Sequence, residues 1–530
     1  MGMRLHGRRL GLLAAALLTI QWSLTAQTPR ATSASAKRPI SYDVVDSWRS
    51  IQATRLSQDG QWLAYALTHK ETMASSLSVI LATDRNSRRQ EVRIHRSPPM
   101  AGSSSSPSRK RRRTKNGSGR RTGATLVRGA GLRGAVTEAA ATARRREHRA
   151  RAWGSWRFPV DRSPRSSVSA ASASPTSRRH GGPVTKADKA DAVVFTLSRF
   201  EEFPNLWISD TSFRNMQKVS DANPQQSEFV WGKSEIIEYI NADGKTLRAI
   251  LTKPDNFDPA KKYPLMVHIY EELTNNLHSY STPNVATSIN ITRYVSNGYV
   301  MLRPDITYAT GYPGESAEKC VIPAVNTVLA MGFIDPKRIG IQGHSWGGYQ
   351  VTHLITRTNL FAAVEAGASV SNMISAYGGI RWGTGMVREF QYEKSQSRIG
   401  APPWDAPLQY IENSPIFWVK KIQTPYLTIH NDADDAVPWY QGIEFNTAMR
   451  RLGKEAYMFT YNGEPHGLRN RDNMKHWTVH MDEFFDHYLF GKPRPEWMDK
   501  GVTYLDRGKR DVAPMFKKKT AATSTSTQDR

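Results

Sequence analysis

One serine in this chain stands where its hydroxyl could act as a nucleophile. Ser345 is the centre of Gly-His-Ser-Trp-Gly at 343–347, which fits the pattern Gly-x-Ser-x-Gly. An apolar strand is predicted before it at 339–342, and a helical stretch after it at 349–356. Such a strand-to-helix turn holds the serine in a strained, exposed position, and the glycines keep Cβ atoms out of the turn. We therefore predict a nucleophile elbow at Ser345.

A nucleophilic hydroxyl needs partners, and later loops of the chain supply them. At neutral pH a serine requires a base, and the base requires an orienting acid. In this architecture the acid and then a histidine follow later strands. A buried-strand pattern at 426–430 leads into an acidic loop at 431–438, and a strand at 456–461 leads into the loop that carries His466. His466 is therefore the candidate base.

Three motifs in this order resemble those of the prolyl oligopeptidase family of serine peptidases. The family carries Gly-x-Ser-x-Gly-Gly, then His-Gly-x-x-Asp-Asp-x-Val, then a late His-Gly. Here they fall at 343–348, 430–437 and 466–467. The resemblance runs from about residue 253 to 498. It implies an α/β fold, the doubly wound sheet of an α/β-hydrolase, at 251–498, preceded by a β-propeller.

The resemblance also implies a catalytic triad, with Ser345 as nucleophile, Asp434 as orienting acid and His466 as general base. Asp435, the second member of the Asp-Asp pair, is the alternative acid. Two further histidines have other expected roles. His344 precedes the nucleophile and is expected to be structural, whereas His430 ends a strand and is expected to pack or hydrogen-bond locally.

Acyl transfer also needs hydrogen-bond donors for the oxyanion of the tetrahedral intermediate. One candidate is the backbone N–H of Trp346, next to the nucleophile. The second should follow an earlier strand, predicted at 265–270, and the resemblance implies the hydroxyl of Tyr270. Alternatively, Tyr270 only caps this buried strand. The family often continues with Gly-Gly, whereas Glu271 and Glu272 follow here.

Aromatic residues at 372–392 are candidates for the pocket that receives the residue before the scissile bond. By resemblance Tyr377 and Trp382 line this pocket, although core packing explains the same residues equally well. The family often has Arg or Asn two residues after the catalytic aspartate, where it holds a substrate carbonyl. Ala436 stands at that position, so a preference for proline is not implied.

The first residues of the chain predict export. Residues 1–26 begin with arginines, continue with an apolar stretch and end in Leu-Thr-Ala. This is typical of a cleaved secretory signal peptide, too short for a firm membrane anchor. We therefore expect a periplasmic or secreted protein that has no membrane contact after cleavage. The single cysteine, Cys320, excludes an intramolecular disulfide and is expected to pack in a helix.

Strand-like patterns at 40–95 and 186–250 resemble blades of the family's β-propeller. A propeller needs at least about four blades of roughly 40–45 residues each, and these two regions hold material for about two. We therefore expect an incomplete, propeller-like all-β region before the hydrolase.

A basic segment at 96–185 separates the two strand-rich regions. Residues 96–180 hold 21 Lys plus Arg against three acidic residues, which gives +18 of the chain's +26. Only seven residues of this segment are Leu, Ile, Val or Phe. They can bury too little apolar surface to offset the entropy of ordering the backbone. We expect disorder, either as a linker or as a replacement for deleted or frame-shifted blades. Residues 508–530 are a second segment of expected disorder.

These patterns together predict a serine peptidase that cleaves short peptides through an acyl-enzyme. Ser-His-Asp chemistry also serves carboxylic esters, so a carboxylesterase is one alternative, and a defective product whose triad never assembles is another. The sequence has no metal-ligand spacing and no phosphate-binding glycine loop, so no metal and no cofactor are expected. The expected partner is a peptide and not nucleic acid, and the oligomeric state is left open.

Overall fold

A computed structural model describes residues 36–69, 75–81, 94–95, 179–503, 505 and 511–517, with the backbone alone for 75–81 and 94–95. The predicted signal peptide, the basic segment as far as residue 178 and most of the predicted tail lie outside the described residues. The described chain forms two compact units. The first comprises the chain as far as Asp46, Asn223–Leu277 and the chain from Ser281, and the second comprises Ser47–Ala222 with His278–Tyr280.

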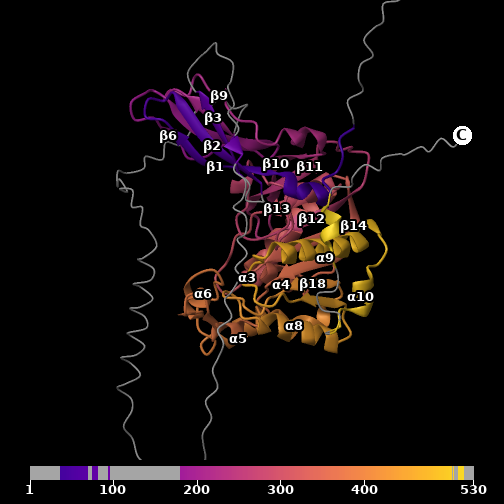
Figure 1. Ribbon diagram of the computed structural model, residues 1–530. Helices are drawn as coiled ribbons and strands as arrows, with labels where there is room; N and C mark the ends of the chain where they lie inside the picture. The colour runs from indigo at the N-terminus through magenta and orange to yellow at the C-terminus, as the bar shows by residue number, and fades with distance from the viewer. Residues whose placement is uncertain are drawn as a thin grey trace, which may run out of the picture. The chain divides into compact units, whose positions relative to one another are not determined.

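An eight-stranded sheet forms the centre of the first unit (Figure 1). In spatial order its strands are β10 (Gly232–Ile240), β11 (Thr246–Pro254), β13 (Val300–Pro304), β12 (Tyr263–His268), β14 (Ile334–His344), β15 (Ala363–Gly367), β18 (Tyr426–Ile429) and β19 (Ala456–Phe459). β10 pairs antiparallel with β11, and β11 pairs antiparallel with β13. From β13 to β19 all pairs are parallel. The inner parallel strands are continuous apolar runs, as expected for strands covered on both faces, and the predicted doubly wound α/β sheet is confirmed.

Helices connect these strands and cover the sheet. They are α2 (Ile291–Ser296), α3 (Pro313–Ala330), α4 (Trp346–Leu354), α5 (Met373–Tyr377), α6 (Glu389–Lys394), α7 (Pro407–Glu412), α8 (Tyr440–Arg451), α9 (Arg471–Phe490) and α10 (Glu496–Lys500). α3, α4 and α8 place apolar side chains in one core cluster with the central strands. Cys320 is buried in α3, as predicted.

The long helix α9 packs closely on β14 and β15. Gly340 makes this approach possible, because a Cβ at that position would lie 2.7 Å from Leu489 Cδ1. The side chain of Asn470 accepts hydrogen bonds from two N–H groups of the first turn, and Gly491 ends the helix in the left-handed conformation with φ 66°. These caps fix where the loop that precedes α9 must end.

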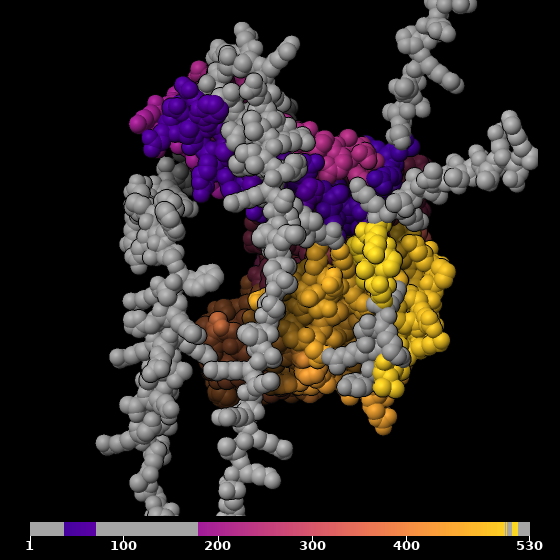
Figure 2. Space-filling model, viewed as in Figure 1, coloured from indigo at the N-terminus to yellow at the C-terminus, as the bar shows by residue number. Residues whose placement is uncertain are grey.

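A short N-terminal segment belongs to the first unit. It contains the 3₁₀ helix η1 (Tyr42–Ser47), and its Val45 packs in a cluster with Val479, Val512 and Phe516. The Tyr42 hydroxyl donates to Asp482 on α9 at 2.7 Å. In Figure 2 the N-terminal residues (indigo) border the C-terminal residues (yellow). The first and last described parts of the chain therefore pack together.

The second unit consists of antiparallel β-sheet. One sheet has β1 (Arg49–Leu56), β2 (Trp62–His69), β3 (Ser75–Leu81) and β4 (Ile94–His95) in sequential order, and the other has β5 (His180–Gly181), β6 (Thr185–Lys186), β7 (Val193–Arg199), β8 (Glu202–Ser209) and β9 (Gln217–Lys218). Side chains of β2, β7 and β8 share one apolar cluster. An all-β region therefore precedes the hydrolase sheet, and its identity as part of a β-propeller stays a prediction.

Four segments differ from the predicted domain boundaries. Residues 511–517 fall inside the tail expected to be disordered, but Val512 and Phe516 are buried in the first unit. β10 was expected within the propeller-like range 186–250, but it pairs with β11 at nine positions and belongs to the hydrolase sheet. Residues 40–46 were expected in a blade, but they pack in the first unit because their apolar side chains are buried there. Strand β5 falls inside the range expected to be disordered, but its backbone is ordered by pairing with β7. Within the described residues, we find no helix with the length and apolar character that a membrane crossing requires.

Candidate active site

Ser345 joins β14 to α4 in a strained backbone conformation. Its φ of 60° and ψ of −116° lie outside the regions that residues other than glycine favour. The backbone N–H of Ser345 donates to Gly367 O at 2.8 Å, and its hydroxyl does not cap α4. The side chain is therefore left available at the N-terminal end of a helix, where backbone N–H groups favour negative charge.

Glycines around Ser345 allow three backbone segments to meet. A Cβ on Gly343 would lie 2.5 Å from Gly347 C, and a Cβ on Gly347 would lie 2.4 Å from Ile269 O. A Cβ on Gly348 would lie 2.4 Å from Gly367 O. Because each clash would be with backbone atoms, none of the three glycines can be replaced without moving a strand or the helix.

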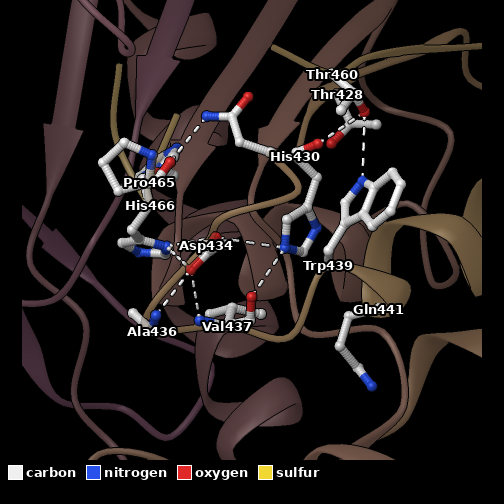
Figure 3. A network of polar contacts seen from close by, with 12 residues as sticks. Thr428, His430, Asp434, Ala436, Val437, Trp439, Gln441, Thr460, Pro465 and His466 are labelled. Atoms are coloured by element: carbon white, nitrogen blue, oxygen red, sulfur yellow. Dashed lines mark hydrogen bonds and ion pairs between the residues drawn. The ribbon is translucent and has the colours of Figure 1, made fainter. Parts of the chain in front are cut away.

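Asp434 lies in the loop after β18 and is 4% exposed. Its Oδ1 accepts hydrogen bonds from the N–H groups of Ala436 and Val437, both at 2.8 Å. His466 Nδ1 approaches the same carboxylate, at 2.8 Å from Oδ2 (Figure 3). Burial alone would raise the pKa of Asp434, but the hydrogen bonds from His430 and His466 hold this pKa well below its ordinary value. The carboxylate is therefore ionised at neutral pH.

The neighbouring Asp435 has a different environment. It is only partly buried, and a Cβ on Gly383, in the turn between β16 (Ile380–Arg381) and β17 (Met386–Val387), would lie 2.8 Å from its Oδ2. Its side chain therefore faces this β-hairpin, whereas the hydrogen bonds of His466 go to Asp434.

Side chains of the acid loop also hold the loop that carries His466. Asn431 accepts from Tyr461 N–H at 3.1 Å and donates to Pro465 O at 2.9 Å. Asp432 accepts from Gly463 N–H at 2.7 Å. Three hydrogen bonds thus hold residues 461–465 of the loop, immediately before His466.

His344 connects this histidine loop to the elbow. Its Nε2 donates to the backbone oxygen of His466 at 2.9 Å, and the two imidazole rings are 4.9 Å apart. Burial lowers the pKa of His344 to about 3, so the ring is neutral. His344 was expected to be structural. It directly precedes Ser345, and its hydrogen bond therefore links the elbow to the loop of His466.

The two candidate oxyanion donors come from adjacent segments. Trp346 begins α4, so its N–H is one of the helix donors that have no partner in the preceding turn. Tyr270 follows β12 and is 38% exposed. Its backbone oxygen accepts from the Gln350 side chain on α4 and from the Tyr308 hydroxyl. These bonds attach the Tyr270 loop to the nucleophile helix.

Glu271 occupies the position at which the resembled family often has glycine. Arg398 donates to its carboxylate at 3.1 Å, and the guanidinium of Arg398 lies 4.2 Å from the ring centre of Tyr308. An ion pair and an aromatic contact therefore hold this loop in place of the glycine turn.

A family model described as the prolyl oligopeptidase family matches residues 314–492. This matched segment contains the elbow, the acid loop and the histidine loop. It belongs to the prolyl oligopeptidase family.

Similar proteins extend the match over about half of the chain. The uncharacterized peptidase YuxL of Bacillus subtilis (strain 168) is 26% identical over 268 residues, covering 48% of this chain and 39% of the relative. Dipeptidyl peptidase 4 of Sus scrofa is 26% identical over 268 residues, covering 47% of this chain and 32% of the relative. The matched part thus spans well under half the length of these relatives.

One solved structure resembles more of the chain. An acylaminoacyl peptidase in complex with Z-Gly-Gly-Phe-chloromethyl ketone aligns with 86% of this chain and 59% of its own, with a TM-score of 0.51 and 15% identity. At this identity the likeness concerns the fold alone. The fold is accordingly an α/β-hydrolase preceded by an all-β region.

The two candidate pocket residues of this prolyl oligopeptidase-family segment differ in exposure. Tyr377, at the end of α5, is 5% exposed, and its hydroxyl donates to Glu393 at 2.7 Å. It packs in an aromatic cluster with Tyr392 and Tyr410. Trp382, in the turn that follows β16, is 73% exposed. Core packing therefore accounts for Tyr377 and does not account for Trp382.

Sequence reasoning missed a buried arginine beside the acid loop. Arg388 is fully buried, donates to the backbone oxygens of Ala376 and Ala436, and contacts the Tyr392 ring. Ala436 stands where the resembled family often has a polar side chain, and here the guanidinium of Arg388, from another segment, binds the Ala436 carbonyl. Within the described residues, no group of three or more His, Cys, Asp or Glu could hold a metal ion.

Proposed function

We propose that Ser345, Asp434 and His466 form the catalytic triad of a serine peptidase. The main support is the 2.8 Å contact between His466 Nδ1 and Asp434 Oδ2. The hydrogen bond from His344, the neighbour of Ser345, to the His466 backbone adds to it. Membership in a peptidase family, with relatives that are themselves named peptidases, supports peptides as the substrate class.

The proposed chemistry is acyl transfer in two steps. Because Asp434 occupies Nδ1 of His466, Nε2 is the ring nitrogen that accepts the Ser345 proton as Oγ attacks the peptide carbonyl carbon. His466 then gives this proton to the leaving amine, and the C–N bond breaks to leave an acyl-enzyme. His466 takes a proton from water as the water oxygen attacks the ester carbonyl. It returns this proton to Ser345 Oγ as the Oγ–carbonyl bond breaks and the acid product leaves. Asp434 stabilises the imidazolium in both steps.

Two donors would stabilise the oxyanion that forms in each step. The Trp346 N–H lies next to the nucleophile in the chain, and the Tyr270 loop is hydrogen-bonded to α4. One such donor typically contributes about 2.7–4 kcal/mol to transition-state stabilisation. We assign these roles to Trp346 N–H and Tyr270 OH.

Short peptides are the proposed substrates. Since the chain matches well under half of its relatives' length, neither the peptide length nor the residue preference is carried over from them. Export to the periplasm or the medium is proposed as well, on the pattern of residues 1–26.

A fluorophosphonate probe tests this function directly. We expect covalent labelling of the whole protein at Ser345, mapped by mass spectrometry, and none in Ser345→Ala. Ser234→Ala, which changes a serine of β10 paired with Thr252, is the matched control and should label as the wild type does. Hydrolysis of an aminoacyl anilide supports a peptidase, whereas turnover of p-nitrophenyl acetate alone would indicate an esterase. Equal labelling of Ser345→Ala would contradict the proposal.

A further inference from the structure

We propose that His430 is a positioning residue of this site, which rests on the proposed function. Its Nε2–H donates to Val437 O, faces the Asp434 carboxylate at 3.4 Å and so helps to fix the carboxylate that orients His466. His430 does not approach the reacting atoms; it acts through the acid.

The contact places two imidazoles on one carboxylate oxygen. His430 Nε2 lies 3.4 Å from Asp434 Oδ2 and 3.2 Å from Val437 O. His466 Nδ1 lies 2.8 Å from the same Oδ2. Figure 3 shows Asp434 between the two rings. Oδ1 accepts from two backbone N–H groups and also lies 3.0 Å from His466 Nδ1. Oδ2 is the oxygen that both imidazoles approach.

The surroundings of His430 determine its tautomer. Nε2 faces two acceptors, a carbonyl and a carboxylate oxygen, so it must carry the hydrogen. Nδ1 is buried and has no hydrogen-bond partner in the described part of the chain. A second N–H, at Nδ1, would be buried without an acceptor. The donor of this ring is thus Nε2–H.

Neighbouring elements hold the ring in this orientation. The backbone of His430 extends the pairing of β18 with β19: its N–H donates to Phe459 O at 3.0 Å, and its carbonyl accepts from the Thr460 hydroxyl at 2.9 Å. A Cβ on Gly442 of α8 would lie 2.6 Å from His430 Nδ1. A glycine at this point of α8 therefore leaves the space that the ring fills.

The charge around Asp434 sets the sign of the expected effect. The ionisable groups that surround it are His430, His466 and His344, with Asp435 next in the chain, Arg388 bound to Ala436 O, and Arg381 near enough to feel its charge. Removing the His430 donor leaves more negative charge on Oδ2. This charge favours the protonated form of His466 over the neutral base, so labelling of Ser345 should require a higher pH in the variant.

The pH dependence of fluorophosphonate labelling tests this in the full chain. For His430→Leu, which removes the donor, we expect the acid limb of the profile to move to higher pH by about half a unit or more. Labelling at neutral pH should fall about tenfold or more, since the lost bond is to a charged group. For peptide hydrolysis kcat should fall and KM stay unchanged, because His430 does not touch substrate.

Matched variants separate positioning from loss of fold. His430→Gln can place an amide N–H near the Nε2 position and should restore most of the rate and the wild-type acid limb. His353→Leu changes another fully buried histidine with an unpartnered Nδ1, on α4 and away from the acid. It should lower stability and leave the acid limb in place. If His430→Leu does not fold, Gly442→Ala, which displaces the ring and keeps the donor, should shift the limb in the same direction.

The outcomes are distinct. An acid limb that stays at the wild-type pH in both His430→Leu and Gly442→Ala, or that moves lower, would overturn the positioning role. So would His430→Gln behaving as His430→Leu does. Absence of labelling in the wild type would instead overturn the proposed function, before His430 is tested.

Discussion

Asp434 and Asp435 are adjacent in the chain, yet their carboxylates have different hydrogen-bond partners. Asp434 is enclosed by the two backbone N–H groups and the two imidazoles around its side chain. Asp435 lies against the turn of the β16–β17 hairpin. Environment, and not residue type, therefore separates the candidate acid Asp434 from its neighbour.

This difference predicts unequal effects of two otherwise identical substitutions. Asp434→Asn should lower kcat on a peptide anilide roughly 10³–10⁴-fold, because the amide cannot stabilise the imidazolium and favours the wrong tautomer of His466. Asp435→Asn should change kcat by less than about threefold, since no bond to His466 is lost. Circular dichroism of both variants controls for folding. If Asp435→Asn were the more damaging change, the acid would be misassigned.

Residues with recognisable chemistry could be identified from the sequence, and the residues that hold them could not. Ser345, Asp434 and His466 stand in motifs with fixed spacing. Asn431 and Arg388 act through amide and guanidinium bonds to backbone carbonyls, and nothing in their local sequence marks the partner. Arg388 meets Ala436 across 48 residues of chain, a proximity that only the folded loops create.

At the scale of elements, the glycines of the elbow limit how β12, β14 and α4 can pack. The Cβ that Gly347 lacks would stand 2.4 Å from the carbonyl oxygen of Ile269. That oxygen belongs to the backbone just after β12, so it cannot swing aside as a flexible side chain would. The elbow and the Tyr270 loop are therefore sterically coupled.

Gly347→Ala is accordingly expected to lower the free energy of unfolding by about 1–3 kcal/mol and to abolish labelling of Ser345. The matched change is Gly378→Ala, where a Cβ meets nothing within 4 Å and φ is −73°. Urea unfolding measures both. A Gly347→Ala protein as stable as Gly378→Ala would show that the elbow tolerates the added methyl group.

Strand type could be predicted wherever burial on both faces left an apolar run, as at 426–430 or 265–270. β10 lies outside the region predicted for it. Most of its side chains are exposed or only partly buried, and such a strand fits the edge of a hydrolase sheet and a propeller blade equally well. The partner strand decides between the two, and the local sequence pattern does not predict which strand that is.

For the whole molecule, buried neutral histidines make stability depend on pH. Burial lowers the pKa of His268 to about 4 and the pKa values of His344 and His353 to about 3. An unfolded chain binds these protons near pH 6.5, so it takes up more protons than the folded chain at any pH between these values. Stability should therefore be intact above pH 6.5 and fall as the pH drops toward 4.

The expected slope is up to about 1.4 kcal/mol per pH unit for each histidine. Urea midpoints between pH 7.5 and 5 measure it. His353→Gln, which cannot take up a proton, should lower stability at pH 7.5 and flatten the slope below pH 6.5. A midpoint that is independent of pH over this range would contradict the burial of these rings in neutral form.

The segment before Asp46 has a consequence for synthesis. Tyr42 bonds to Asp482, 440 residues further along the chain, and Val45 packs against Val512 and Phe516. A ribosome that adds about 5–20 residues per second needs about 20–90 s to supply the partner. During that interval the segment cannot pack on α9. Its docking is therefore a late step, which follows synthesis of residues 479–516.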